Sequence, residues 1–111
     1  MSDCLFCKII AGDIPSDQVY QDEQVIVFKD INPSAPIHLL VVPRLHIESL
    51  NEMDDTHSEL ISHMMLLLPK IAKEQGLTGG FRTILNTGTE GGQLVFHLHI
   101  HLLGGKQLPG F

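Results

Sequence analysis

Residues 97–103 alternate histidines with aliphatic residues, and this short segment constrains the fold more than any other part of the chain. It reads His97-Leu98-His99-Ile100-His101-Leu102-Leu103. Successive side chains of a β-strand point to opposite faces. A strand here therefore places three histidines on one face and Leu98, Ile100 and Leu102 on the other. The aliphatic face is suited to a core, and the histidine face is suited to lining a site.

The spacing of the three histidines indicates how they would be used. Alternate residues of a strand stand roughly 6–7 Å apart. That separation suits contacts with different parts of a phosphate-sized ligand better than binding of one ion by all three rings. The ordinary pKa of histidine lies nearest neutrality, so an imidazole can act as nucleophile, base or acid. The pattern favours a chemical site over a strand that carries histidines by chance.

Length and composition indicate one globular domain. The chain has 111 residues, of which 43% are hydrophobic and 18% are charged. This length allows one core but not two, so residues 1–111 are expected to form a single domain. The formal net charge of −6 argues against a protein that binds nucleic acid by neutralising its phosphates. A small nucleotide remains a possible ligand.

The N-terminus and the cysteines predict a cytoplasmic protein. Met1-Ser2-Asp3-Cys4 lacks the basic start and apolar core of a signal peptide, and no apolar run is long enough to span a membrane. Only two residues separate Cys4 from Cys7, which is poor spacing for a structural disulfide. We therefore expect reduced thiols, an intracellular location and no membrane association.

Hydrophobic periodicity predicts a short helix and three strands in the first part of the chain. Apolar residues at positions 5, 6, 9 and 10 have helical spacing, and Gly12 ends that helix. Residues 19–20 and 25–28 flank Asp22-Glu23, which is a hairpin pattern. Residues 37–42 form a nearly continuous apolar run, typical of a buried strand, that is interrupted by His38.

A long helix and two further strands are predicted in the rest of the chain. Residues 56–75 carry an apolar stripe, with Thr56 and Glu59 as a capping box, Gly76 as the end and Pro69 as the source of a kink. His57 and His63 belong to this helix and are expected to be surface or boundary residues. Residues 82–86 and 95–103 are the last two strands. This order predicts an α+β fold with a mainly antiparallel sheet.

The pair Cys4-Leu5-Phe6-Cys7 suggests a metal site. Two thiolates at this spacing can bind one ion, and zinc usually takes four ligands, so surplus histidines could complete a Cys2His2 site. A thioredoxin-like redox motif is a rival interpretation, but it requires a βαβ unit that this N-terminus lacks. Two thiols that simply pack in the core are a third.

Residues 88–93 form a glycine-rich turn directly before the histidine strand. Glycines let backbone N–H groups approach an anion closely, so this turn is a candidate phosphate contact. Asn86 could add an amide contact to the same ligand. Asp30, after the strand that ends at Phe28, could accept hydrogen bonds from sugar hydroxyls or serve only as a turn residue.

The chain resembles the histidine triad (HIT) family. Residues 97–103 fit the H-φ-H-φ-H-φ-φ signature at all seven positions, and other segments resemble the nucleoside phosphoramidate hydrolase (Hint) branch. Those segments are residues 6–10, 28–33, 35–38, 42–47 and 91–93, in the family's order. The resemblance covers nearly the whole chain. It implies a five-stranded antiparallel sheet with one long and one short helix, and a homodimer whose long helices and C-terminal strands join two sheets into one.

The same resemblance implies a hydrolase of purine nucleoside 5′-phosphoramidates, such as AMP-amine adducts. His99 resembles the nucleophile that forms a nucleotidyl-histidine intermediate, whereas His101 and His38 resemble the histidines that hold the phosphate and manage protons. The implied substrate contacts are Asp30 for the ribose, Asn86, Gly92 and Gln93 for the phosphate or leaving group, and Phe6, Ile9, Phe28 and Ile31 around the base.

Family members that carry this C-x-x-C pair bind a structural zinc ion through the cysteines and two histidines. By motif position, the ligands here are implied to be Cys4, Cys7, His46 and His97. His97 would then be a structural ligand and not a catalyst.

Two positions depart from the branch. Leu94 stands where a serine or threonine often hydrogen-bonds the phosphate, and a buried leucine there is expected to slow the reaction. The tail, residues 106–111, is short and lacks tryptophan, and in the family the tail usually shapes specificity.

Other functions remain open at this point. One is dinucleoside polyphosphate hydrolysis or nucleotidyl transfer, although the transferase branch typically has glutamine where this chain has His101. Another is a non-catalytic module that binds a nucleotide or a partner, which Leu94 keeps open. A third is a metalloenzyme that uses the three histidines as zinc ligands. Turnover of an AMP-amidate separates the enzymes from the binding module, and activity that survives a strong chelator excludes catalytic zinc.

Overall fold

A computed structural model describes residues 3–111, which form an antiparallel five-stranded sheet with one helix on each face. The strands are β1 (Gln18–Gln21), β2 (Val25–Lys29), β3 (Ile37–Pro43), β4 (Arg82–Ile84) and β5 (Ile100–Gly104). Their order across the sheet is β1-β2-β3-β5-β4, and every neighbouring pair is antiparallel. The predicted fold class is confirmed.

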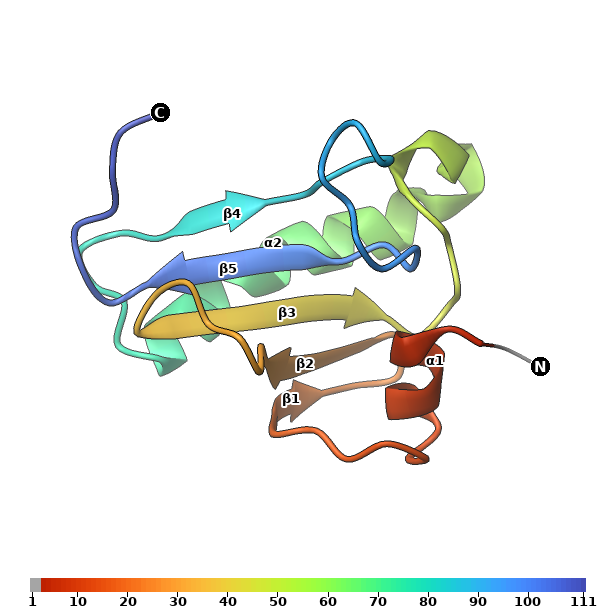
Figure 1. Ribbon diagram of the computed structural model, residues 1–111, viewed down its shortest axis with the longest axis horizontal. Coiled ribbons are helices and arrows are strands. Elements are labelled where there is room, and N and C mark those ends of the chain that lie inside the picture. Colours follow the sequence, from red (N-terminus) through yellow and green to blue (C-terminus); the bar gives the residue numbers. More distant parts are fainter. Residues whose placement is uncertain (1–2) are drawn as a thin grey trace.

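Alternation along β2 and β3 divides the interior into two clusters. Val25 and Val27 of β2 pack into the larger cluster with α2 (Ser58–Glu74), whereas Ile26 and Phe28 pack into the smaller one with α1 (Leu5–Ile10). Figure 1 shows α2 crossing behind β3 and β5, while α1 lies where β3 ends. Because the smaller cluster covers only part of the sheet's second face, room for a site is left beside it.

The N-terminus of the long helix differs from the prediction. The long helix follows His57, which makes no side-chain cap hydrogen bond, and Asp54 instead caps the short 3-10 turn before it. The Asp54 carboxylate accepts the backbone N–H of Thr56 at 2.9 Å, and the His57 ring completes the capping box of that turn. The Thr56 hydroxyl donates to the same carboxylate, so it is not left to cap the helix. Asp55–His57 therefore forms a 3-10 turn, which follows a similar turn at Leu50–Glu52, and α2 begins at Ser58.

The rest of α2 agrees with its predicted stripe. Its buried residues are all apolar: Leu60, Met64, Leu67, Leu68, Ile71 and Ala72. Pro69 lies inside the helix, and the kink expected there stays a prediction. Within residues 3–111, no helix has both the length and the hydropathy needed to cross a membrane.

The histidine segment forms a shorter strand than expected. β5 begins at Ile100, and residues 97–99 lie outside the ladder. Extending the β3–β5 register places Leu98 opposite Pro43, which has no N–H to donate. The N–H of Leu98 instead donates to the carbonyl of Ile47 at 2.7 Å. The pairing of β5 with β4 is also shorter than expected. β4 ends at Ile84, which pairs with His101, and β5 extends only one residue before His101, to Ile100.

Asp22 anchors the β1–β2 turn and connects it to α2. One carboxylate oxygen accepts the N–H groups of Gln24 and Val25, each at 2.8 Å, and the other accepts the Tyr20 hydroxyl at 2.7 Å. The same oxygen lies 2.6 Å from Nε2 of His63 on α2. His63 is therefore more than the plain boundary residue that the sequence suggested, since it ties the long helix to the hairpin.

These contacts make Asp22 a stability determinant that depends on pH. Burial raises its pKa, but the hydrogen bonds from Tyr20, Gln24, His63 and Val25 outweigh burial and lower it from 3.8 to about 2. A lowered carboxyl pKa stabilises the fold fully above the unfolded value and is lost as pH falls through the folded value. We predict that Asp22→Asn lowers the free energy of unfolding at pH 7 by about 2 kcal/mol. Urea unfolding should show this difference shrinking toward zero near pH 2. An equal difference at both pH values would contradict it.

Candidate active site and metal site

The three histidines of the signature share the sheet face that carries α1. Leu98, Ile100 and Leu102 belong to the larger core cluster behind the sheet, so the alternating histidines point the other way. His97 is fully buried, His99 is 7% exposed and His101 is partly exposed. The alternation therefore persists through residues 97–99 even though they make no ladder.

A backbone carbonyl sets the tautomer of His99. Nδ1 of His99 lies 2.7 Å from the carbonyl oxygen of His97, so Nδ1 must carry the proton that it donates. Nε2 of the neutral ring then holds a lone pair. Burial also lowers the pKa of His99, which favours this neutral form. The His99 ring lines a cavity, so the site presents an imidazole nitrogen in the state that a nucleophile requires.

A chain of hydrogen bonds orients His101 through His38. The backbone N–H of Ser34 donates to Nδ1 of His38 at 2.9 Å, so the proton of the neutral His38 ring lies on Nε2. That Nε2–H donates to Nδ1 of His101 at 2.9 Å. The remaining proton of His101 is thereby assigned to Nε2. Burial and the neighbouring His99 and His38 lower the pKa of His101 to about 4, so the ring is neutral at pH 7 and acts as a hydrogen-bond donor through Nε2.

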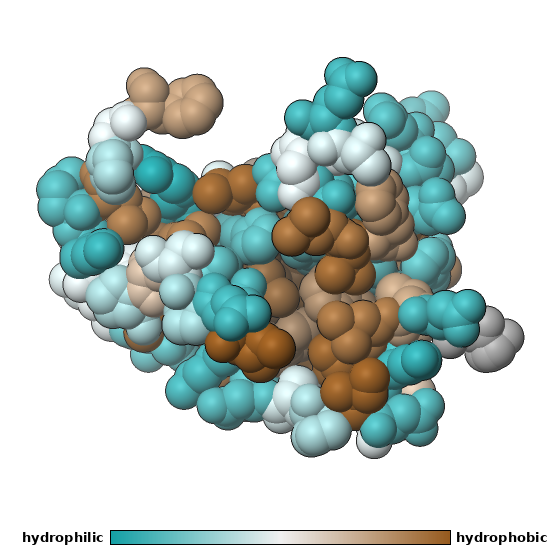
Figure 2. All heavy atoms as spheres, viewed as in Figure 1, coloured by the Kyte–Doolittle hydropathy of each residue, from teal (hydrophilic) through white to brown (hydrophobic). Residues whose placement is uncertain are grey.

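A cavity of about 390 Å³ lies beside these rings. Its volume is in the range of small-ligand sites. Figure 2 shows apolar side chains gathered around a hollow on this face of the molecule. Apolar side chains from α1 and β2 form one end, and Asp30 contributes a carboxylate held by the N–H of Asn32 at 2.8 Å. The predicted residues that line it are Phe6, Ile9, Phe28, Asp30, Ile31, Asn86, Gly92, His99 and His101.

Two predicted contact residues lie behind the cavity wall. His38 is buried and does not line the cavity: its Nε2 contacts two residues that do, His101 at 2.9 Å and a carboxylate oxygen of Asp30 at 3.4 Å. The amide of Gln93 is 3% exposed and braces the glycine turn: it accepts the N–H of Gly88 and donates to the carbonyls of Glu48 and Val95. Its side chain therefore shapes the turn and does not line the cavity.

Leu94 is not buried, contrary to the expectation. It lines the cavity but is 90% exposed, as is Ile31, which also lines the cavity. Figure 1 shows the loop between β4 and β5 projecting from the sheet, so nothing in residues 3–111 covers this side chain.

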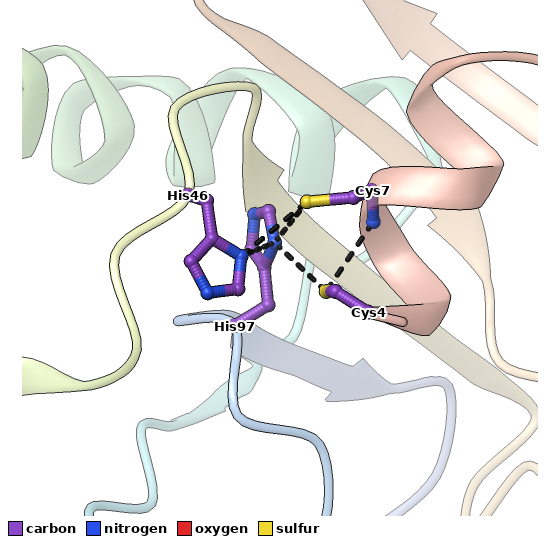
Figure 3. A group of neighbouring side chains, drawn as sticks. All are labelled: Cys4, Cys7, His46 and His97. Carbon is purple, nitrogen blue, oxygen red and sulfur yellow. Dashed lines mark hydrogen bonds between the residues drawn. The ribbon is translucent and has the colours of Figure 1, made fainter. Parts of the chain in front are cut away.

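The second predicted site is a cluster of four side chains from three segments of the chain. Cys4 caps α1 and Cys7 lies one turn later, while His46 follows β3 and His97 precedes β5. Figure 3 shows both sulfurs and both Nδ1 atoms converging on one point. Their ligand atoms all lie within 4.8 Å of one another, which is close enough to bind a metal ion.

The chemistry of these donors fits a tetrahedral ion. Nε2 of His97 lies 2.7 Å from the carbonyl of Pro43 and donates to it, so the Nδ1 lone pair faces the sulfurs. Nδ1 of His97 is 3.3 Å from Sγ of Cys4 and 3.1 Å from Nδ1 of His46, and Sγ of Cys7 is 3.3 Å from the latter atom. A tetrahedral zinc ion with ordinary bond lengths separates its ligands by roughly 3.3–3.8 Å.

Another group of possible ligands, formed by Asp30, His38 and His101, is less suitable. Ser34 donates to Nδ1 of His38, so Nε2 of that ring carries a proton where a metal needs a lone pair. This tautomer makes His38 a poor ligand for a metal ion in that group.

A larger cavity of about 480 Å³ lies at the other end of the sheet. It is lined by residues 76–82 and 104–108 and includes no histidine, cysteine or carboxylate side chain. The smaller cavity is therefore the better candidate for chemistry.

Comparison with known proteins identifies the family. A family model described as "Scavenger mRNA decapping enzyme C-term binding" matches residues 3–110. Protein HitA of Neisseria gonorrhoeae is 54% identical over 104 residues, which is 94% of this chain and 97% of that protein. The chain belongs to the histidine triad (HIT) family. A HIT family hydrolase from Legionella pneumophila, known from a crystal structure, has 44% identity and a TM-score of 0.94, with 96% of each chain covered. The purine nucleoside phosphoramidase of Escherichia coli K12 is 45% identical over 105 residues, 94% of this HIT chain and 88% of the relative.

Some residues that build the HIT site could not be found from the sequence. Ser34 and Pro43 act through backbone groups that orient His38 and His97, and such groups leave no signal in residue type. Phe6 was predicted only as a base contact, yet its ring stands edge-on to His99 with centroids 5.0 Å apart. The helical spacing of apolar residues at positions 5, 6, 9 and 10 was the available signal for that position.

Proposed function

We propose that this HIT protein hydrolyses the P–N bond of purine nucleoside 5′-phosphoramidates through a nucleotidyl-histidine intermediate on His99. The observation that carries the proposal is the bond from His99 Nδ1–H to the His97 carbonyl, which leaves the other ring nitrogen unprotonated at the cavity. The purine nucleoside phosphoramidase of Escherichia coli K12, at 45% identity, supports the substrate class.

The chemistry divides into two displacements at phosphorus. Nε2 of His99 attacks the α-phosphorus and the P–N bond to the amine breaks. The departing nitrogen takes its proton from solvent water, while the Nε2–H of the neutral His101 donates a hydrogen bond at the reacting phosphate. Water then attacks the same phosphorus, the bond to His99 breaks, the nucleoside monophosphate leaves, and the proton of the attacking water passes to solvent. Two such steps are easier than one direct substitution by water.

The remaining contacts suit a purine nucleotide. Asp30 lines the cavity and would accept hydrogen bonds from the ribose hydroxyls, and Phe6, Ile9, Phe28 and Ile31 would offer an apolar environment for the base. In this proposal Asn86 and the backbone of Gly92, which line the same cavity, contact the phosphate. Both can donate hydrogen bonds to the negative charge that develops there. His38 acts by orienting His101, and Gln93 acts by bracing the glycine turn.

A panel of substrates tests the proposal. AMP- and GMP-amidates should be turned over with higher kcat/KM than pyrimidine amidates or dinucleoside polyphosphates. Preference for a dinucleoside polyphosphate would favour the alternative hydrolase. Nucleotide binding with no turnover of any compound would favour a binding module.

Leu94 provides a test of the phosphate contact. Its exposed side chain cannot donate a hydrogen bond, whereas a serine could reach a phosphoryl oxygen. Removing one such donor elsewhere costs about 10²–10³ in rate, and backbone donors of the turn reduce that effect here. We predict that Leu94→Ser raises kcat several-fold with little change in KM, which marks an interaction made mainly in the transition state. Leu94→Ala is the matched control. An equal gain in both variants, or none in the serine variant, would show that side chain 94 does not face the phosphate.

We also propose that the metal at Cys4, Cys7, His46 and His97 is zinc and plays a structural role. The two thiolates and two imidazoles suit that ion. Thiolate ligands need a reducing compartment, which supports the cytoplasmic location expected from the sequence.

A homodimer is proposed from the exposed apolar side chains of α2 and β4. Met65 and Leu66 are 52% and 68% exposed on α2, Ile84 is 36% exposed on β4, and β4 is an open edge of the sheet. Open edges and apolar helix faces favour association. We predict that Leu66→Asp converts a wild-type dimer to a monomer, as measured by light scattering after size exclusion. Leu50→Asp, at an exposed leucine of another element, should leave the dimer intact. A wild-type monomer, or a dimeric Leu66→Asp protein, would contradict this interface.

A further inference from the structure

The metal cluster and the nucleotide cavity share one short structural element. Cys4 and Cys7 lie at the start of α1, and the next face of the same helix carries Phe6 and Ile9 into the cavity. The chain that follows, through Ile14, Pro15 and Ser16, continues the cavity wall. Residues 4–16 are therefore attached to the cluster at one end and form a wall of the cavity along the rest.

α1 is a short helix that depends on contacts with the rest of the protein. It is a helix of six residues, and isolated helices of this length are unstable in water. Its two buried residues, Phe6 and Ile9, pack into the smaller core cluster. The four ligands of the cluster connect the start of this helix to the segments that follow β3 and precede β5.

The same segments position the nucleophile. The Phe6 ring stands edge-on to His99 with an interplanar angle of 87°, and it also contacts Phe28 and His97, with centroids 5.5 and 5.9 Å away. The carbonyl that orients His99 belongs to His97, which is itself a candidate metal ligand. Movement of the cluster would therefore disturb two contacts of the His99 ring, the hydrogen bond to the His97 carbonyl and the packing against Phe6.

From this arrangement we infer that metal occupancy of Cys4, Cys7, His46 and His97 controls nucleotide binding, because the metal holds α1 against the cavity. This inference rests on the proposed function, since it assumes that the cavity binds a nucleotide. Phe6 is then a positioning residue that transmits the state of the cluster to His99. The coupling must be reciprocal: a ligand that needs the α1 wall must in turn strengthen metal binding by the same factor.

The first measurement compares AMP binding to metal-loaded and metal-free protein by calorimetry. Because Phe6 and Ile9 supply apolar contact from α1, we expect the Kd for AMP to rise about tenfold or more on metal removal. The change should reverse when zinc is restored. His46→Gln removes the exposed ligand, which does not line the cavity, and should weaken AMP binding in the same direction. His63→Gln, a histidine replacement away from both sites, should bind AMP like the wild type.

Hydrogen exchange tests whether the effect is local. Metal removal should increase exchange in residues 4–16 and around His46, while β3 and α2 remain protected. Loss of protection throughout β3 and α2 would overturn the inference, because the metal would then hold the whole fold and not one wall. Equal AMP affinity with and without metal would also overturn it.

The reciprocal measurement uses Co²⁺ as a spectroscopic probe of the cluster. Adenosine has no phosphate to bind the ion, and it should raise the affinity of the cluster for Co²⁺ in competition with a chelator. An unchanged Co²⁺ affinity at saturating adenosine would refute the coupling. Failure of the metal-loaded protein to bind AMP would instead refute the proposed function, on which the inference depends.

Discussion

Replacement of His99 by alanine should remove nearly all phosphoramidate turnover, by a factor of at least about 10⁴. The reason is that no other ring of the site has its state set in the same way. The proton of His99 is held by the His97 carbonyl, which leaves a lone pair on Nε2, whereas His101 is assigned a proton on Nε2 by the chain from Ser34 and His38. Only His99 can therefore attack phosphorus without first losing a proton.

The variant is expected to fold, since the aliphatic neighbours of His99 carry the packing. Leu98 and Ile100 are buried in the larger core cluster, and His99 lies on the opposite side of the chain. Steady-state turnover of an AMP-amidate measures the loss, and circular dichroism confirms the fold. His63→Gln serves as a control because His63 contacts only the Asp22 network in the contacts described above. Residual activity within about tenfold of the wild type would show that His99 is not the nucleophile.

Loss of a metal ligand should produce the largest change in stability. Protein purified without chelator should contain about one zinc ion per chain, and Cys7→Ala should contain none. Metal-binding free energy contributes to folding, so we expect the melting temperature to fall by about 10 °C or more in the variant or after chelation. Cys7 lies within hydrogen-bond distance of both ligand histidines, so its loss opens the cluster directly.

The control for this prediction repeats the comparison of wild type and Cys7→Ala with both proteins stripped of metal. If the cluster stabilises the fold through the metal, the two melting temperatures should then differ much less. A wild-type protein that is metal-free and has the same melting temperature after zinc addition would contradict the site. The two cysteines would then be packing residues at the start of α1.

Local periodicity predicted the sheet well because the relevant contacts are built into each segment. Successive side chains from Val25 to Phe28 and from Leu39 to Val42 pack in turn into the two core clusters, as the pleat of a strand requires, and both strands formed where they were expected. The segment at residues 97–99 was not predicted as well, because its ladder depends on a residue far away in sequence. Pro43 lies opposite this segment and cannot donate the hydrogen bond that would continue the strand.

The start of α2 illustrates a different limit. Thr56 and Asp54 are both acceptable caps by residue type, and the choice between them depends on which side chain can reach the backbone. The carboxylate of Asp54 accepts both the N–H and the hydroxyl of Thr56, a geometry that spacing alone does not distinguish.

The candidate site was accessible from the sequence only in part. The three histidines of one strand face followed from alternation, but their different roles did not. His97 turns its Nδ1 to the cysteines because Pro43 accepts its other proton, and His99 turns its Nε2 outward because a carbonyl accepts the proton on Nδ1. Likewise, the pairing of Cys4 and Cys7 with His46 and His97 joins segments distant along the chain, and it was implied by the family resemblance and not by any local pattern.

If the proposed mechanism holds, His99 becomes covalently linked to the nucleotide, and this intermediate can be trapped. Wild-type protein mixed with an AMP-amidate and quenched within one turnover should carry a mass increase of one adenylyl group, mapped by peptide sequencing to His99. The adduct should be absent from His99→Ala and should persist longer in variants that slow the second step. An adduct mapped to His97 or His101, or turnover of the amidate with no adduct on any histidine, would contradict the account.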